Sequence, residues 1–264
     1  MSYSVKIRPV ALKVYYFFVR RPYNYLPDEA HSIVAESEFT ELFLRHSGRA
    51  CDKWHHYLPI YDQLFNSFCQ DPKRVIKSKS AFKFLELGVF KGGSLQLWRK
   101  YFGSEAVIHG VDIDPRCSEL SSDDLPVHIG SQSDPKFLID VVNQMGGIDV
   151  VLDDGSHRAK HQRISFRTLF PLLADGGLYV IEDTHTSYWL AYGGGFKRPG
   201  TAIELGKKLV DDMHAWYHRF PSKYKKLAQY EIFSIQFFDS IIVIKKGQRN
   251  RPVKSTRGTD PFLK

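Results

Sequence analysis

Five short apolar runs alternate with segments of helical periodicity between residues 82 and 181, and this alternation constrains the fold more than any other feature. The runs cover 82–87, 106–111, 127–129, 148–152 and 178–181, and the predicted helices cover 94–101, 134–145 and 160–173, the last stopped by Gly176-Gly177. Strands that alternate with helices form a parallel sheet with right-handed crossovers. Two later runs, 231–237 and 240–245, predict an antiparallel hairpin at the sheet edge. We therefore expect an α/β protein with a doubly wound, mostly parallel sheet.

The segments on either side of this region differ in character. Short helices are predicted at 37–46 and 54–69, and the charged tract 71–79, which contains Pro72, is typical of a linker. We divide the chain into a helical N-terminal extension or cap (1–75), a sheet domain (76–246) and a basic tail (247–264).

The net charge of +8 belongs to the two ends of the chain. Residues 1–21 hold five basic residues and no acidic one, residues 245–264 hold seven basic and one acidic, and the rest carries a net charge of −3. A surface that binds nucleic acid normally lies on the folded body. We therefore expect no nucleic-acid partner.

The three cysteines and the N-terminal residues bear on location. Three cysteines without paired spacing argue against a disulfide framework and favour a reducing compartment. The longest N-terminal apolar run, 14–19, is far shorter than the ~20 residues of a membrane span, so we expect a cytoplasmic protein. The aromatic and basic segment 14–21 has the composition of a short interfacial helix, which leaves weak membrane-surface or partner docking as an alternative.

Glycines and acids follow the predicted strands, where an open parallel sheet binds its ligands. The first strand leads into a turn that contains Gly88 and Gly92, and the second ends at Asp112. Glycines let a ligand approach the backbone, and an acid at the end of the second strand commonly binds the ribose hydroxyls of an adenosine cofactor. A purely structural glycine turn is the alternative.

The fourth and fifth strands both end in acidic pairs. Asp153-Asp154 is followed by His157, and Glu182-Asp183 ends the next strand. Carboxylates that meet at one sheet edge suit Mg²⁺ or a similar divalent ion, with His157 close enough to act as a base. The alternative is that these acids cap helices. His157 and His161 also have the spacing of a zinc pair, but no third soft ligand is near them in the sequence.

The segments FLELGVFKGGS, GVDIDP, DDGSH and GGLYVIEDTHTSYW resemble class I S-adenosylmethionine-dependent methyltransferases. More narrowly, they are similar to the metal-dependent macrolide-sugar O-methyltransferases and the cephalosporin-hydroxylase-like proteins. The resemblance covers residues 52–246 and includes DKWHHYLPIYDQLF in the helical extension.

The resemblance implies a Rossmann-like fold and an O-methyltransferase that acts on a hydroxyl of a sugar or glycosylated acceptor, with S-adenosylmethionine and Mg²⁺ or another divalent cation as cofactors. It implies that Asp154, Glu182 and Asp183 hold the metal, that His157 is the general base with Asp154 beside it in catalysis, and that the enzyme forms a homo-oligomer. The cofactor-binding residues expected are Glu86, Gly88, Gly92, Ser94, Asp112, Ser131, Gln132 and Asp153. An oxygenase-like enzyme on the same scaffold and a docking protein with a vestigial cofactor site are the alternatives.

Two further segments have both a functional and an ordinary interpretation. Residues 184–201, which contain aromatic residues and three consecutive glycines, suit a mobile loop over a sugar acceptor or an oligomer contact. Lys53, His55, His56 and Tyr57 suit a cover over the site or an ordinary helix face.

Overall fold

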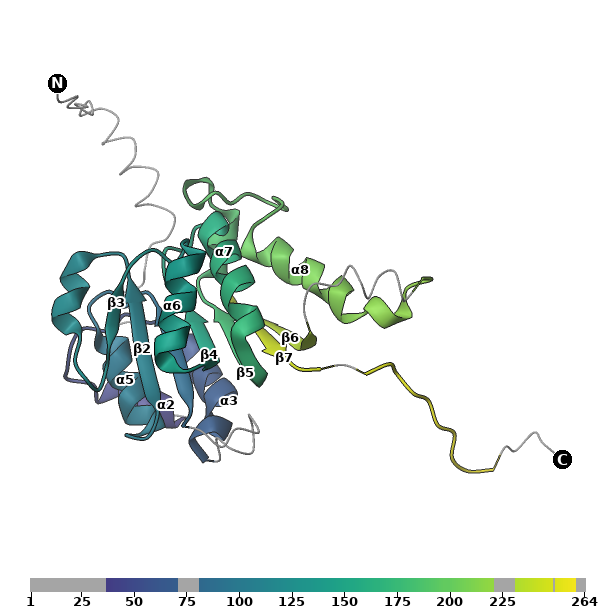
Figure 1. Cartoon of the computed structure of the whole chain (residues 1–264), viewed down its shortest axis with the longest axis horizontal. Coiled ribbons are helices and arrows are strands. Elements are labelled where there is room, and N and C mark those ends of the chain that lie inside the picture. The colour runs from purple at the N-terminus through teal and green to yellow at the C-terminus, as the bar shows by residue number, and fades with distance from the viewer. Residues whose placement is uncertain (1–36, 71–80, 221–230, 249, 260–264) are drawn as a thin grey trace, which may run out of the picture.

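One seven-stranded sheet organises the computed structural model, which describes residues 37–70, 81–220, 231–248 and 250–259 (Figure 1). The strand order is β3-β2-β1-β4-β5-β7-β6. Strands β1 to β5 pair in parallel, and β7 pairs antiparallel with both β5 and β6, so the expected sheet and hairpin are confirmed. The strands are β1 (Lys83–Leu87), β2 (Val107–Asp112), β3 (Val127–Ile129), β4 (Ile148–Asp153), β5 (Leu173–Ile181), β6 (Ile232–Phe238) and β7 (Ile241–Lys246).

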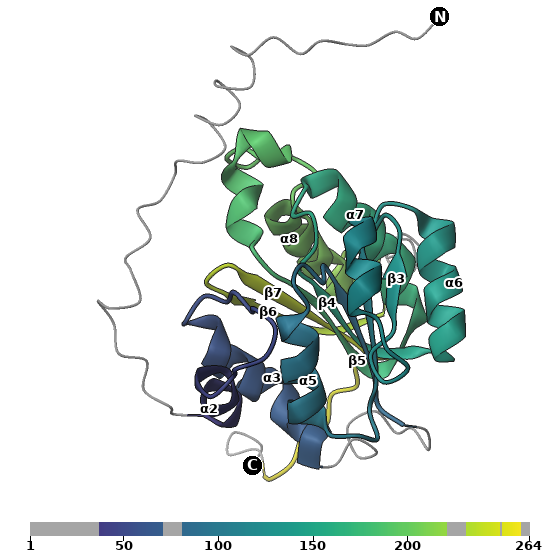
Figure 2. The same cartoon turned by 90° about the vertical axis from the view of Figure 1, so that its left-hand side faces the viewer.

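Helices cover both faces of the sheet. On one face lie α2 (Glu38–Leu44), α3 (Tyr57–Gln70) and α5 (Gly93–Phe102), and on the other lie α6 (Pro135–Met145), α7 (Ala159–Leu169) and α8 (Ala202–Met213) (Figure 2). Short 3₁₀ turns occupy Pro115–Leu120, Phe170–Leu172, Thr184–Tyr188, Leu190–Tyr192 and Ala215–Tyr217. Side chains alternate along a strand, so each central strand contributes to both layers of the core.

An aromatic cluster joins the N-terminal helices to the sheet. Phe39 of α2 stacks on Trp98 of α5 with ring centroids 4.5 Å apart, and Phe65 of α3 meets the same indole edge-on at 5.6 Å. Phe84 of β1 lies beneath them, 5.1 Å from Trp98 and 5.9 Å from Phe65. The expected helical extension therefore shares its core with the sheet.

The predicted end of the α7 helix was wrong. The helix ends at Leu169, and a 3₁₀ turn through Pro171 leads directly into β5, four residues before the glycines that were expected to stop it. Proline cannot donate a backbone hydrogen bond, so it ends the α-helical pattern first. Gly177 serves the sheet instead, because a Cβ there would lie 2.5 Å from the Asp149 carbonyl oxygen of β4. Helix α8 was not anticipated.

Glu86, which was expected to contact a cofactor, lies inside the core on the α5 side of β1. It is fully buried, and it accepts hydrogen bonds from the Ser94 hydroxyl at 2.9 Å and from the Trp98 indole N–H at 3.1 Å. Burial raises the pKa of Glu86 to about 7, even though the nearby Lys53 ammonium acts in the opposite direction. Glu86 and Ser94 thus hold the start of α5 against β1.

Asp153, the last residue of β4, is also fully buried, on the α7 side of the sheet. Its carboxylate accepts hydrogen bonds from the Gln132 amide at 2.9 Å, the Ser165 hydroxyl at 2.6 Å and the Tyr179 hydroxyl at 2.9 Å. A buried carboxylate is costly unless such donors surround it. Asp153 therefore ties β4, β5 and α7 together.

Several predictions from the sequence lie outside the described residues. These include the docking segment 14–21, nearly all of the tract 71–79 and the boundary between 75 and 76. The division into extension, sheet domain and tail stays a prediction. No helix among the described residues is long and apolar enough to cross a membrane.

We expect Phe65→Ala to lower the free energy of unfolding by about 3–5 kcal/mol, because it removes a buried ring that joins α3 to the sheet. Urea unfolding followed by circular dichroism would measure this change. Asn66→Ala, an exposed neighbour on the same helix, is the control and should change stability by less than about 0.5 kcal/mol. A small loss in Phe65→Ala would show that α3 is not part of the core.

We expect the stability difference between wild type and Glu86→Gln to depend on pH. Since the pKa of Glu86 is raised from 4.5 to about 7 in the folded state, the folded chain holds a proton that the unfolded chain releases between these values. Wild type should therefore lose roughly 3 kcal/mol relative to Glu86→Gln as the pH rises through this window. Urea unfolding at a series of pH values would test this, with the exposed Glu105→Gln as control. A pH-independent difference would contradict the raised pKa.

Candidate active site

A cavity of about 980 Å³ lies beyond the carboxyl ends of the parallel strands. This volume is within the range of small-molecule and cofactor sites. Seven of the residues predicted from the sequence line it: Gly88, Asp112, Ser131, Gln132, Asp154, His157 and Asp183. The sheet thus brings together residues that are up to 95 positions apart in the chain, from Gly88 to Asp183.

The turn after β1 is built around Gly88, whose φ is +97°. A Cβ at this position would lie 2.2 Å from the backbone carbonyl oxygen of Asp154, so only glycine lets the ends of β1 and β4 meet this closely. The Asp112 carboxylate accepts hydrogen bonds from the Val89 and Phe90 N–H groups, both at 2.9 Å. Asp112 therefore holds the turn in place while it also faces the cavity.

The other expected cofactor residues play supporting roles. Glu86, Gly92, Ser94 and Asp153 do not line the cavity. Gly92 instead caps α5 with a φ of +78°. The expected direct contacts of these four residues with a cofactor are thus not present in this geometry: their side chains, or the Gly92 backbone, shape the elements around the cavity.

Gln132 has a double role at the cavity wall. Its amide nitrogen donates to Asp153, and its Oε1 accepts from the Ser156 N–H at 2.6 Å. A Cβ on Gly155 would lie 2.3 Å from the same oxygen. Gln132 therefore fixes the Asp154–His157 loop, while Ser131 beside it bonds to Ser133 at 2.8 Å and faces the cavity.

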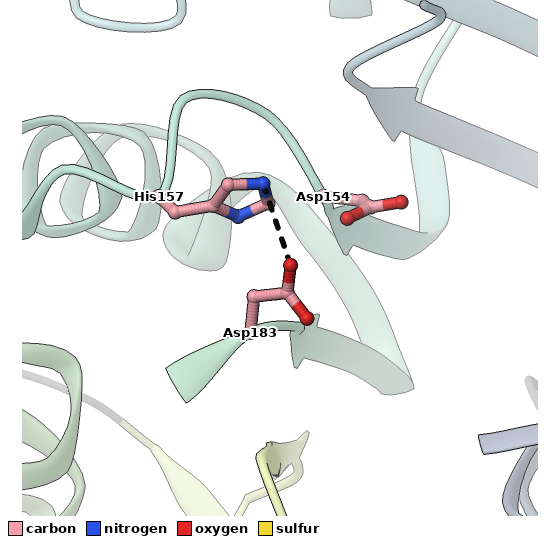
Figure 3. A group of neighbouring side chains, drawn as sticks. All are labelled: Asp154, His157 and Asp183. Atoms are coloured by element: carbon pink, nitrogen blue, oxygen red, sulfur yellow. Dashed lines mark ion pairs between the residues drawn. The ribbon is translucent and has the colours of Figure 1, made fainter. Parts of the chain in front are cut away.

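Asp154, His157 and Asp183 form a cluster at the cavity, which we call the Asp154–Asp183 cluster (Figure 3). One potential ligand atom from each residue lies within 4.8 Å of the others. His157 Nε2 is 3.6 Å from Asp183 Oδ2. Both residues have a φ above +50°, an uncommon conformation for side chains other than glycine that is often found at functional sites.

Chemically, the Asp154–Asp183 cluster fits a divalent ion. Two carboxylates supply hard oxygen ligands. The Nδ1 atom of His157 is buried and has no hydrogen-bond partner in the described part of the chain, so this polar atom lacks a counterpart. His161, the other member of the possible zinc pair, instead bonds to the Ser156 hydroxyl through Nδ1 at 2.9 Å.

Glu182, expected as a metal ligand, is not part of the Asp154–Asp183 cluster. It is 1% exposed, and its Oε2 accepts a hydrogen bond from Lys53 Nζ at 2.8 Å, while its Oε1 accepts one from the Tyr61 hydroxyl at 2.7 Å. Glu182 does not line the cavity. Its side chain points into the protein because the two acids that follow one another in the chain lie on opposite sides of the end of β5.

The N-terminal extension supplies three polar groups to these acids. Lys53 forms ion pairs with Asp154 and Glu182, and the Tyr57 hydroxyl donates to Asp183 Oδ1 at 2.8 Å. Together with Tyr61, these residues follow a spacing of four along the chain, which puts them on one side of the entry to α3. The covering role considered for Lys53 and Tyr57 therefore agrees with the structure, whereas His55 and His56 do not line the cavity.

Tyr61 escaped the sequence analysis because its signal is ambiguous. An aromatic residue at helical spacing usually packs into a core, and Tyr61 does pack against Phe39 and Trp98. Only its hydroxyl serves the acids. A polar tip on a core side chain is visible only after the helix has been placed on the sheet.

The segment between β5 and α8 lies beside the Asp154–Asp183 cluster (Figure 1). The Tyr192 ring is 6.4 Å from the His157 ring and 5.8 Å from the Trp189 ring, measured between centroids. Leu190 and Phe196 are each 80% exposed. Aromatic side chains thus extend from the acids towards an exposed apolar surface.

Comparisons with known proteins relate this chain to sugar O-methyltransferases. It is 36% identical over 232 residues to the 8-demethyl-8-(2-methoxy-alpha-L-rhamnosyl)-tetracenomycin-C 3'-O-methyltransferase of Streptomyces olivaceus, which covers 84% of this chain and 55% of that protein. It is 32% identical over 219 residues to the demethylmacrocin O-methyltransferase of Streptomyces fradiae, which covers 81% and 54%. The chain spans about half the length of these curated relatives. No family model matches the chain.

Solved structures agree with this relation. The MycE methyltransferase from the mycinamycin biosynthetic pathway, in complex with Mg, SAH and mycinamycin VI, superposes with a TM-score of 0.66 at 30% sequence identity, over 80% of this chain and 54% of that chain. Another crystal form with Mg and SAH gives a TM-score of 0.68 at 28% identity, over 86% and 57%. The sheet order, the strand-end cavity and these similarities lead to one conclusion: the chain belongs to the class I S-adenosylmethionine-dependent methyltransferases and is related to the macrolide-sugar O-methyltransferases.

Proposed function

We propose that this protein is an S-adenosylmethionine-dependent O-methyltransferase that methylates a sugar hydroxyl of a glycosylated small molecule, assisted by a divalent metal ion. One observation carries the proposal: the glycine turn with Asp112 and the Asp154–Asp183 cluster face the same cavity. A cofactor held by the first and an acceptor held by the second would meet there. The relatives named for sugar O-methylation support this choice of reaction.

We assign the cofactor to the side of the cavity lined by Gly88, Asp112 and Ser131. S-adenosylmethionine supplies a methyl group already activated by a positive sulfur. The close approach at Gly88 leaves backbone accessible to a ligand, and a carboxylate such as Asp112 suits ribose hydroxyls. The exposed rings of Phe90 and Ile113, 65% and 71% accessible, offer an apolar surface for a base at the same mouth.

We assign the metal to the Asp154–Asp183 cluster, with the two carboxylates as its ligands. When bound there, a divalent ion would stabilise negative charge that develops on the acceptor oxygen. Tyr57 orients Asp183 through the hydrogen bond to Oδ1, which leaves Oδ2 towards His157. The ligand carboxylates would therefore be held ready before the ion arrives.

We assign the proton transfer to His157. A sugar hydroxyl barely ionises at neutral pH, so a base at the acceptor oxygen lowers the barrier to methyl transfer. His157 lies at the cavity beside both carboxylates, and its Nδ1 has no partner in the described residues. Asp183, 3.6 Å from Nε2, would stabilise the imidazolium that forms.

We assign the acceptor to the neighbourhood of Trp189 and Tyr192, next to His157. Aromatic faces suit the apolar faces of a sugar ring and of a polyketide aglycone. The consecutive glycines 193–195 include two with φ values of +77° and +154°, which a larger residue would not adopt easily. Assembly into a homo-oligomer remains an expectation from the family.

We expect Asp112→Ala to weaken S-adenosylmethionine binding by about tenfold or more, since it removes a charge-assisted partner of the ribose and frees two turn amides. Calorimetric titration of the purified protein with S-adenosylmethionine would measure this, with the exposed Asp123→Ala as the matched control. Wild type that binds no S-adenosylmethionine would refute the proposed function. Unchanged binding in Asp112→Ala would refute only the role of Asp112.

We expect Asp154→Asn and His157→Ala each to lower turnover by about 100-fold or more, and to leave cofactor affinity within about threefold of wild type. Turnover can be followed as transfer of a labelled methyl group to a panel of polyketide glycosides with free deoxysugar hydroxyls. Asp140→Asn, an exposed position on α6, is the control. Loss of S-adenosylmethionine binding in both site variants would show that these residues hold the cofactor instead.

A further inference from the structure

Lys53 is a buried cation between two acids of adjacent strands. Its ammonium group contacts the Asp154 carboxylate and donates to Glu182 Oε2 at 2.8 Å, and its side chain is only 3% exposed. Asp154 follows β4 and Glu182 follows β5, so the space that the ammonium fills lies between neighbouring strand ends. Lys53 does not line the cavity, whereas Asp154 does.

Without this ammonium, the same space would attract a divalent ion. Two carboxylates at adjacent strand ends repel one another in a buried setting, and a metal ion relieves that repulsion as well as an ammonium does. The Tyr61 hydroxyl on Glu182 Oε1 leaves Oε2 as the oxygen that would face such an ion. The acids thus offer two places for a cation, an inner one between Asp154 and Glu182 and an outer one at the Asp154–Asp183 cluster.

We propose that Lys53 is a positioning residue that occupies the inner place and so confines the divalent ion to the Asp154–Asp183 cluster. This inference rests on the proposed function. Because one ammonium group bridges both acids, Asp154 keeps one side of its carboxylate for Lys53 and presents the other to the cavity. Glu182 serves as the anchor of Lys53 and not as a metal ligand.

The consequence for the reaction is geometric. A divalent ion at the inner place would lie behind Asp154, away from the cavity where cofactor and acceptor meet. It would be bound more tightly, because an uncompensated carboxylate pair attracts it, and it would be useless for the acceptor oxygen. Removal of Lys53 should therefore raise metal affinity and lower turnover together, a combination that simple damage to the fold does not produce.

The test is a titration of the full-length protein with Mn²⁺ alone, followed by electron paramagnetic resonance and calorimetry. We expect Lys53→Met to bind Mn²⁺ about tenfold more tightly than wild type and to lose most of its turnover, since a buried positive charge near the ion is gone. Lys53→Arg, which keeps the charge, should retain Mn²⁺ affinity within about threefold of wild type.

Glu182 provides the second arm. We expect Glu182→Gln alone to change Mn²⁺ affinity by less than about threefold, and Lys53→Met with Glu182→Gln to return the affinity to the wild-type range. A large loss of Mn²⁺ binding in Glu182→Gln would make Glu182 a ligand and overturn the proposal. Unchanged or weaker binding in Lys53→Met would do the same. If Lys53→Met does not fold, Glu182→Gln decides.

The same samples separate this proposal from the proposed function. S-adenosylmethionine binding and methyl transfer by wild type test the methyltransferase reaction, with or without any effect of Lys53. If wild type transfers methyl groups and binds no Mn²⁺, the role of Lys53 is overturned and the reaction stands without its metal. If wild type binds Mn²⁺ as expected and transfers no methyl group, the proposed reaction fails while the placement of the ion is still decided by the variants.

Discussion

The parallel register of the central strands is the constraint on which the rest of the structure depends. Leu87 is level with Val111 on one side and with Asp153 on the other, and Asp153 is level with Ile181. Because these strands run in the same direction, the residues that follow each one emerge at one edge of the sheet. A single cavity can therefore collect side chains from distant parts of the chain, and the carboxylates among them crowd together.

That crowding explains how the rest of the protein is arranged around the edge. Acids that point into the core receive neutral donors, as Glu86 does from Ser94 and Trp98. Acids at the strand ends receive groups from the N-terminal extension, and Lys53 is the cation that offsets them. The helices before the sheet are thus held by the aromatic core and, through the residues at their start, stabilise the charges of the site.

Much of this arrangement could be predicted from the sequence because its signals are local. Alternating apolar runs and helical periodicity predicted the parallel sheet and the edge hairpin, and the acids after β4 and β5 predicted a polar site. The end of α7 was misplaced because Pro171 acts before the glycines do. The partition of the acids could not be predicted, since neighbours in sequence such as Asp153 and Asp154 point to opposite sides of a strand and meet different partners.

By itself, the sequence determined the order of strands and helices, the place of the glycine turn and the kinds of groups available at the strand ends. Periodicity and turn chemistry are properties of short segments, so one chain is enough to reveal them. Only the tertiary structure decided which carboxylates face the cavity and which are neutralised inside, because that depends on groups brought from far along the chain. Lys53 reaches Glu182 across 129 positions, and no local pattern encodes a contact of that kind.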